Sequence, residues 1–167
     1  MLYQFLKKIV GIAFNIVNIL MAGNLPPFGC VCAVIEQDHH YLVVGLPNQD
    51  AAFPGGFMRW QEHPEQTALR ECKEETGLDI RTRDVIGYQT YVSKRFDQMS
   101  TINIIYRAEV IGGTLRKSVE GQPYWLHETT LRAKLAPHYK DVFDAYLRTQ
   151  HNLPKSEHDV FKHDVLN

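Results

Sequence analysis

The chain has 167 residues, which is room for one domain of ordinary size. Hydrophobic residues make up 44% and charged residues 22%, close to globular averages, which excludes intrinsic disorder and fibrous repeats. Eighteen Lys and Arg against nineteen Asp and Glu give a net charge of −1, so the basic excess that nucleic-acid binding requires is missing. Three cysteines, Cys30, Cys32 and Cys72, are odd in number and lack zinc spacing, which favours buried thiols in the reducing cytoplasm.

Residues 1–27 form an unusual first segment, predicted as an amphipathic helix followed by a hinge at Pro26-Pro27. Its polar positions lie three and four apart and trace one narrow stripe on a helix: Gln4, Lys7, Lys8, Asn15 and Asn18, with Gly11 in line. The apolar run from Ile9 to Ala22 covers about fourteen residues, fewer than the ~20 that a membrane span requires.

Three interpretations of this helix stay open. The favoured one is a helix docked on its own domain or on the partner of a homodimer. A helix lying in a membrane interface is the second, and it would give peripheral membrane association. A signal peptide is the third, because two lysines precede an apolar stretch, although Asn-Leu-Pro-Pro after Gly23 is a poor cleavage context.

The next elements alternate between strand and helix patterns. Apolar residues Phe28 to Glu36 predict a strand, and Tyr41 to Leu46 predict its hairpin partner. From Pro64 to Thr76 the periodicity is helical, with a proline in the first turn and Gly77 as the stop signal.

Further strand-like segments follow at Ile80–Val92, Thr101–Ile111 and Pro123–Leu126. A last amphipathic helix is indicated by Val142, Phe143, Tyr146 and Leu147. We therefore expect an α/β domain over residues 28–150 and a polar C-terminal tail over residues 151–167.

Three glutamates gather on the predicted helix over 64–76. Glu71, Glu74 and Glu75 fall within an arc of about 100°. Like charges at this spacing destabilise a solvated helix by roughly 0.2–0.5 kcal/mol per pair, and by more when buried. A hard divalent cation would explain them, because carboxylate oxygens are preferred ligands of Mg²⁺ and Mn²⁺. Leu69 and Cys72 are expected to face away and pack on the sheet.

Neighbouring residues support this cluster. Arg70 can reach Glu74 one turn later and fix its carboxylate. Glu62 lies just before the helix, where its charge suits the helix dipole. Gly55-Gly56 allows a close backbone approach, so a main-chain carbonyl could complete a metal shell.

The full string from residue 56 to residue 78 matches the pattern G-x5-E-x7-R-E-U-x-E-E-x-G-U, in which x is any residue and U is a bulky apolar residue. Its fixed positions are Gly56, Glu62, Arg70, Glu71, Cys72, Glu74, Glu75, Gly77 and Leu78. This string resembles the signature of the Nudix hydrolases. Cys72 is the single departure, at a packing position where an aliphatic residue is usual. The strand pattern over residues 28–147 is also similar to the α/β/α sandwich of that family, with a mixed sheet, to which this chain adds an N-terminal helix.

The resemblance implies metal-dependent hydrolysis of the pyrophosphate linkage of a nucleoside diphosphate derivative, a small-molecule substrate, with water attacking phosphorus. Mg²⁺ would be the cofactor, and Mn²⁺ could replace it. Glu71, Glu74 and Glu75 would be metal ligands, with Glu71 also a candidate base. The Gly56 carbonyl would be a further ligand, and Arg70 and Glu62 would orient the helix carboxylates. The chemistry agrees, because pyrophosphate cleavage depends mainly on charge neutralisation and water activation.

Family members often use one more carboxylate outside the motif, as ligand or base. Candidates are Asp97, Glu109 and Glu120. Glu120 is preferred, because Glu120-Gly121-Gln122-Pro123 followed by Trp125 resembles the corresponding stretch of the oxidised-guanine triphosphatases of this family.

Candidate substrate-binding residues are Arg59 inside the motif and Tyr91, Lys94 and Arg95 beyond it, where cationic side chains could hold distal phosphates. A base could stack on an aromatic side chain, although a packing role is favoured for each of Trp60, Tyr91, Phe96 and Tyr106. No marker of the ADP-ribose or diadenosine polyphosphate subfamilies follows the motif, so the sequence leaves the substrate open.

Two alternatives to an ordinary enzyme are a catalytically silent nucleotide-sensing module and a membrane-associated diphosphohydrolase held by residues 2–21. The complete set of motif carboxylates argues against the first alternative.

Overall fold

The computed structural model describes residues 2–47, 50–119, 121–150 and 163–164. Its helices are α1 (Leu2–Leu20), α2 (Pro64–Thr76), α3 (Glu128–Lys134) and α4 (Pro137–Gln150). Its strands are β1 (Phe28–Gln37), β2 (His40–Gly45), β3 (Ala51–Ala52), β4 (Gly55–Phe57), β5 (Leu78–Tyr91), β6 (Thr101–Gly113), β7 (Pro123–His127) and β8 (His163–Asp164).

The described strands form one mixed sheet. They run in the order β3-β2-β1-β6-β5-β8, with β4 also paired to β1 and β7 to β2. Strands β1 and β6 are parallel, whereas β1 and β2 form the expected hairpin, closed at Gln37 and His40. Its turn residues Asp38 and His39 adopt positive φ angles of 50° and 58°.

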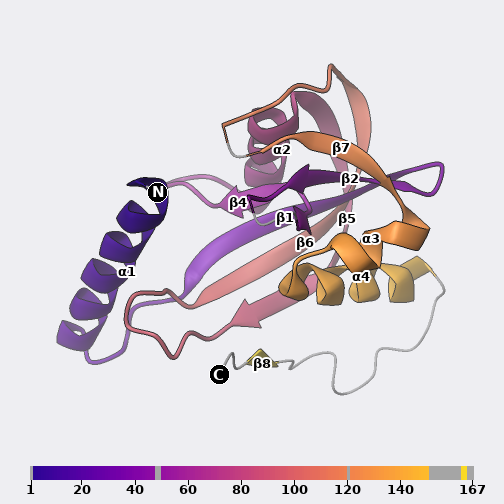
Figure 1. Cartoon of the computed structure of the whole chain (residues 1–167). Coiled ribbons are helices and arrows are strands. Elements are labelled where there is room, and N and C mark those ends of the chain that lie inside the picture. Colours follow the sequence, from indigo (N-terminus) through magenta and orange to yellow (C-terminus); the bar gives the residue numbers. More distant parts are fainter. Residues whose placement is uncertain (1, 48–49, 120, 151–162, 165–167) are drawn as a thin grey trace.

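Helices cover both faces of the sheet (Figure 1). The side chains of successive residues of β1 pack on opposite faces. Cys32 and Val34 pack in a core cluster with Val142 and Phe143 of α4. Ala33 packs in a second cluster with residues of α2 and of four strands, namely Ile35 of β1, Leu42 of β2, Cys72 of α2, Leu78 and Ile80 of β5, and Ala108 of β6. The predicted α/β/α sandwich with a mixed sheet is thereby confirmed.

Helix α2 has the bounds that the sequence predicts. It starts at Pro64 and stops before Gly77, which adopts the left-handed conformation at φ 80°. Cys72 is buried as expected, but the expectation for Leu69 is wrong, because this residue is 40% exposed. Glu75 lies on the buried face of α2 instead. Its carboxylate accepts a hydrogen bond from the backbone N–H of Gly55.

Helix α1 lies beside the loop that joins β5 to β6 (Figure 1). It contacts this loop through a residue of its polar stripe. The Asn15 side chain donates hydrogen bonds to the carbonyls of Phe96 at 2.7 Å and Gln98 at 2.9 Å. Asn18 accepts one from the backbone N–H of Leu25 at 3.0 Å. Gly11 is buried, and a Cβ atom there would lie 2.5 Å from the Asp97 carbonyl. In the described part of the chain no helix is both long and apolar enough to cross a bilayer.

The predicted tail over 151–167 falls mostly outside the described residues. Two of its residues, His163 and Asp164, are described, and they pair in parallel with Thr90 and Tyr91 at the end of β5. The sequence pattern did not predict this short strand.

Candidate active site

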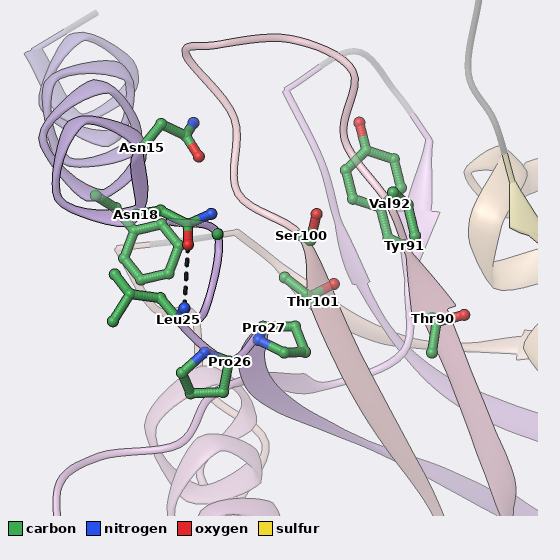
Figure 2. A pocket seen from close by; sticks show the side chains of 12 residues that line it. Asn15, Asn18, Leu25, Pro26, Pro27, Thr90, Tyr91, Val92, Ser100 and Thr101 are labelled. Atoms are coloured by element: carbon green, nitrogen blue, oxygen red, sulfur yellow. Dashed lines mark hydrogen bonds between the residues drawn. The ribbon is translucent and has the colours of Figure 1, made fainter. Parts of the chain in front are cut away.

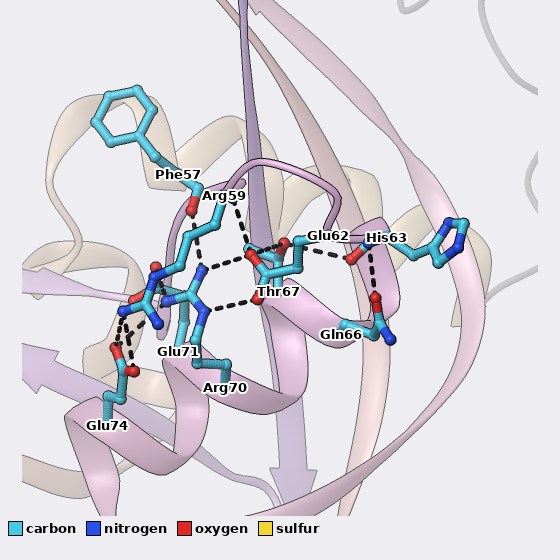
Figure 3. Close-up of polar contacts among 9 residues, drawn as sticks. All are labelled: Phe57, Arg59, Glu62, His63, Gln66, Thr67, Arg70, Glu71 and Glu74. Atoms are coloured by element: carbon cyan, nitrogen blue, oxygen red, sulfur yellow. Dashed lines mark hydrogen bonds and ion pairs between the residues drawn. The ribbon is translucent and has the colours of Figure 1, made fainter.

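The guanidinium of Arg70 is the centre of a buried polar network at the start of α2 (Figure 3). Its Nε and Nη2 atoms donate to the two carboxylate oxygens of Glu62 at 2.7 and 2.8 Å. Nη1 donates to Glu71 at 2.6 Å, and Nη2 also donates to the Phe57 carbonyl at 3.0 Å. The Arg70, Glu62 and Glu71 side chains are only 13–15% exposed. These contacts raise the pKa of Arg70 and keep it charged.

Glu62 is fully engaged by its own surroundings. Besides Arg70, its carboxylate accepts hydrogen bonds from the Arg59 N–H at 2.9 Å and the Thr67 hydroxyl at 2.8 Å. The hydrogen bond from Arg70 is the main reason that the pKa of Glu62 falls from 4.5 to about 2. With both oxygens occupied, Glu62 is placed to orient Arg70 rather than to bind a ligand.

The three helix glutamates differ in exposure and in partners. Gly56 lies directly against Glu71, where a Cβ atom would come within 2.5 Å of the carboxylate. Glu75 is 7% exposed, and it accepts a hydrogen bond from the Gly55 N–H at 2.9 Å. Both buried carboxylates are therefore fixed against the Gly55-Gly56 backbone.

Glu74 has the most exposed of the site's carboxylates. Its side chain is 48% exposed, and its two oxygens accept hydrogen bonds from Arg59 Nη2 at 3.0 and 3.2 Å. Arg70 Nη1 lies 3.3 Å from the same group, the contact expected at one-turn spacing. Arg59, which the sequence indicated for substrate binding, is therefore brought to the carboxylate cluster.

Oxygen donors of this kind suit Mg²⁺ or Mn²⁺, since they are the hard ligands that these ions prefer. Within the described residues, however, no three acidic, His or Cys side chains already stand in a cation-binding arrangement. The guanidinium groups of Arg59 and Arg70 lie among the carboxylates and neutralise them. An exposed pair such as Arg59–Glu74 stabilises by about 0–1 kcal/mol, so a divalent cation can displace it.

Tyr91 and Arg95 bond within the β5–β6 loop. The Tyr91 hydroxyl donates to Gln98 at 2.8 Å, and Arg95 forms a two-point ion pair with Asp97 at 3.0 and 2.9 Å. Lys94 is exposed on the same loop. Among the described contacts, none joins these three predicted substrate residues to the α2 carboxylates.

Instead, Tyr91 lines a pocket between α1 and the ends of β5 and β6 (Figure 2). Asn15, Asn18, Pro27 and Ser100 are among the other lining residues.

The preferred outer carboxylate, Glu120, lies outside the described residues. Its neighbour Gly121 packs so closely on β2 that a Cβ atom would lie 2.2 Å from the Gly45 carbonyl. The two other candidates are held by surface arginines, Asp97 by Arg95 and Glu109 by Arg83 at 2.6 Å. The role of Glu120 stays a prediction.

The favoured packing role holds for Tyr106, which is 6% exposed. It is wrong for Trp60, which is 90% exposed and adjoins Arg59, and for Phe96, which is 51% exposed. Sequence reasoning also missed the hydrogen bonds that the Thr67 hydroxyl and the Gly55 N–H donate to Glu62 and Glu75. The Gly55-Gly56 pair was a signal for the second, whereas nothing in the pattern pointed to Thr67.

Comparisons with known proteins agree with this fold. The sequence profile of the NUDIX domain matches residues 26–146. An ADP-ribose pyrophosphatase of Methanocaldococcus jannaschii is 30% identical over 129 residues, covering 74% of this chain and 75% of that protein. An NAD-capped RNA hydrolase, NudC, of Vibrio atlanticus is 27% identical over 109 residues, covering 62% of this chain and 39% of that protein.

A solved structure of a NUDIX hydrolase from Nitrosomonas europaea superposes with a TM-score of 0.64 at 22% identity. The match covers 84% of this chain and all of that one (100%). The chain therefore belongs to the NUDIX family, as a pyrophosphohydrolase, and the resemblance seen in its sequence is confirmed.

Proposed function

We propose that the protein hydrolyses the pyrophosphate linkage of a nucleoside diphosphate derivative, with ADP-ribose as the first candidate, in a reaction that depends on Mg²⁺ or Mn²⁺. The observation that carries this proposal is the group of motif carboxylates gathered around Arg70 and the Gly55-Gly56 backbone. ADP-ribose is suggested by the name of the M. jannaschii relative. Its hydrolysis adds water across the phosphoric anhydride and gives AMP and ribose 5-phosphate.

Glu71, Glu74, Glu75 and the Gly56 carbonyl would hold the cation, and Glu120 is the candidate for a further ligand or base. When bound, the cation neutralises charge on the phosphate oxygens and activates water for attack. The protein contributes positioning, because Glu62 holds Arg70 by two hydrogen bonds and Arg70 in turn fixes Glu71. Glu71 is the candidate to accept the proton of the attacking water.

Arg59 is proposed to bind a substrate phosphate. Its side chain is 61% exposed and its present partner, Glu74, is one of the proposed cation ligands. Once Glu74 turns to a cation, the planar guanidinium is free to make a two-point contact with phosphate oxygens. The exposed indole of Trp60, next in the chain, is proposed to stack on the base.

Residues 28–150 are proposed as the catalytic domain, and a reducing compartment, the cytoplasm, as its location. The cysteines support that location, since Cys30, Cys32 and Cys72 are thiols and not disulfides. Burial raises the pKa of the Cys32 thiol to about 12, which leaves it unreactive.

The test is release of nucleoside monophosphate from a panel of ADP-ribose, nucleotide sugars, NADH, dinucleoside polyphosphates and nucleoside triphosphates. Each compound is incubated with Mg²⁺, with Mn²⁺ and with chelator. We expect cation-dependent turnover that is lost in Glu74→Gln and kept in Glu128→Gln, a matched change at an exposed carboxylate of α3 outside the site. Cation-dependent binding of one compound without turnover would instead support the nucleotide-sensing alternative.

A further inference from the structure

Helix α1 presents its apolar side away from the protein. Eight large apolar residues of this segment are 38–79% exposed, and together they form what we term the apolar arc: Ile9, Val10, Ile12, Ile16, Val17, Ile19, Leu20 and Met21. A helix on a water-soluble protein ordinarily turns such a face inward. An exposed surface of this kind marks an interaction site.

The orientation of α1 is fixed by specific contacts on the opposite side. Asn15 donates hydrogen bonds to two carbonyls of the β5–β6 loop, and Gly11 permits contact with the Asp97 carbonyl. The Phe14 ring packs on Phe28, with ring centroids 4.6 Å apart. The apolar arc therefore points outward, because contacts on the opposite side of the helix hold it against the domain.

The width of the apolar arc indicates what covers it. At about 100° per residue, its members span an arc of about 200°. One partner helix covers a stripe of about 100°, so a second copy of α1 would leave much of the arc in water. The arc also contains no hydrogen-bonding side chain, whereas protein–protein interfaces carry several hydrogen bonds. A continuous apolar medium matches both observations.

The charge around the arc selects the kind of surface. Residues 1–35 contain two lysines, Lys7 and Lys8, and no acidic residue. The loop that supports α1 carries exposed Lys94, exposed Arg95 in its ion pair with Asp97, and Phe96, whose ring is exposed beside the helix. Basic residues bordering an apolar helix face are the pattern of a helix that lies in the interface of an anionic bilayer.

We propose that the apolar arc of α1 lies in the interfacial layer of a phospholipid bilayer with anionic headgroups and holds the enzyme on its surface. The helix inserts its aliphatic side chains between the lipids while Asn15 keeps it joined to the catalytic domain and Asn18 holds Leu25 in the turn that follows it. The polar stripe predicted from the sequence is thus the attachment to the protein, and the apolar remainder is the attachment to lipid. This proposal is independent of which nucleotide the enzyme hydrolyses.

The experiment is flotation of the full chain with vesicles of phosphatidylcholine alone and of phosphatidylcholine mixed with phosphatidylglycerol. Flotation separates bound protein from aggregates, which sediment. The test variant is Val17→Glu with Leu20→Glu, and the matched control is Val85→Glu with Ile111→Glu, two exposed apolar positions on β5 and β6. Thermal unfolding of all proteins without lipid checks that they fold.

We expect the wild type to float with anionic vesicles and the control to do the same, with weaker binding in high salt. The α1 variant should lose binding by about tenfold or more. The proposal is overturned if the wild type floats with neither kind of vesicle. It is also overturned if the α1 variant floats as well as the wild type does. Sedimentation velocity without lipid adds a further outcome, because a defined dimer abolished by the α1 substitutions, with no vesicle binding, would assign the arc to a second copy of the chain.

Discussion

Arg70 and Glu62 meet edge to edge, with Nε and Nη2 of the guanidinium 2.7 and 2.8 Å from the two oxygens of the carboxylate. The two residues are eight positions apart, one just before α2 and the other in its second turn. Their contact leaves Nη1 of Arg70 directed at Glu71. The geometry of the proposed cation ligands thus depends on a pair that binds no cation itself.

Replacing Arg70 should be the most destabilising change in the site. Arg70→Ala leaves the partly buried Glu62 and Glu71 carboxylates without this cation, and we expect the free energy of unfolding to fall by about 2–3 kcal/mol. Arg70→Lys restores charge but not the two-point contact, so it should recover only part of the loss. Urea unfolding with chelator present measures both. Arg83→Ala, at an exposed ion pair, should stay within about 1 kcal/mol of wild type, and similar values for the two alanine variants would contradict this account.

Acid should weaken the fold through Glu62. Its pKa is about 2 in the folded protein and 4.5 in its ordinary state, so the unfolded chain takes up a proton first as the pH falls. The contribution is fully present above pH 4.5 and is lost as the pH falls toward 2, by up to about 3 kcal/mol. Unfolding free energies measured across this range should fall less steeply for Glu62→Gln than for the wild type or for Glu109→Gln. Parallel curves for all three proteins would exclude this role for Glu62.

Gly56→Ala should damage catalysis more than folding. The new Cβ atom would lie 2.5 Å from the Glu71 carboxylate, which must then move. Displacement of a catalytic group by about 1 Å can lower the rate about 100-fold. The comparison is Gly87→Ala on β5, where a Cβ atom would meet no atom within 4 Å. Steady-state rates of AMP release from ADP-ribose, or from whichever compound proves to be the substrate, distinguish the two, and an active Gly56→Ala enzyme would count against the placement of Glu71.

Arg59→Ala should affect substrate and cation in opposite directions. Loss of a charge-assisted contact to phosphate should raise KM by roughly tenfold or more with a smaller change in kcat. Release of Glu74 from its present partner should lower the cation concentration needed for half-maximal activity. Arg83→Ala serves as the charge-matched control. If Arg59→Ala raises both KM and the cation requirement, the proposed exchange of partners by Glu74 is wrong.

The positions of the main elements follow from local signals, which is why the sequence predicts them well. Pro64 marks the start of α2, because proline is favoured in the first turn of a helix. Gly77 marks its end, because glycine adopts φ 80° without steric cost. The short strands β3, β4 and β8 and the seven-residue helix α3 were missed. Such short pieces are stabilised by pairing or packing with distant residues, which a local pattern does not contain.

In the candidate site, too, local sequence predicts some features while others depend on distant contacts. The spacing of Glu71, Glu74 and Glu75 placed them on one helix, but the partner of each carboxylate depends on tertiary contacts with Gly55 and Arg59. Periodicity also defined the polar stripe of α1 without showing which side of the helix meets the domain. Asn15 settles that orientation by bonding to carbonyls more than eighty positions away.

The contact between α1 and the domain includes the two hydrogen bonds that Asn15 donates, and their chemistry bears on which solvents can break the contact. Water offers donors and acceptors that compete with Asn15, whereas hydrocarbon offers neither. An apolar environment around the helix would therefore strengthen the contact between α1 and the domain and would not disrupt it. Mild detergents should leave α1 attached to the domain, and urea, which solvates peptide groups, should detach it first.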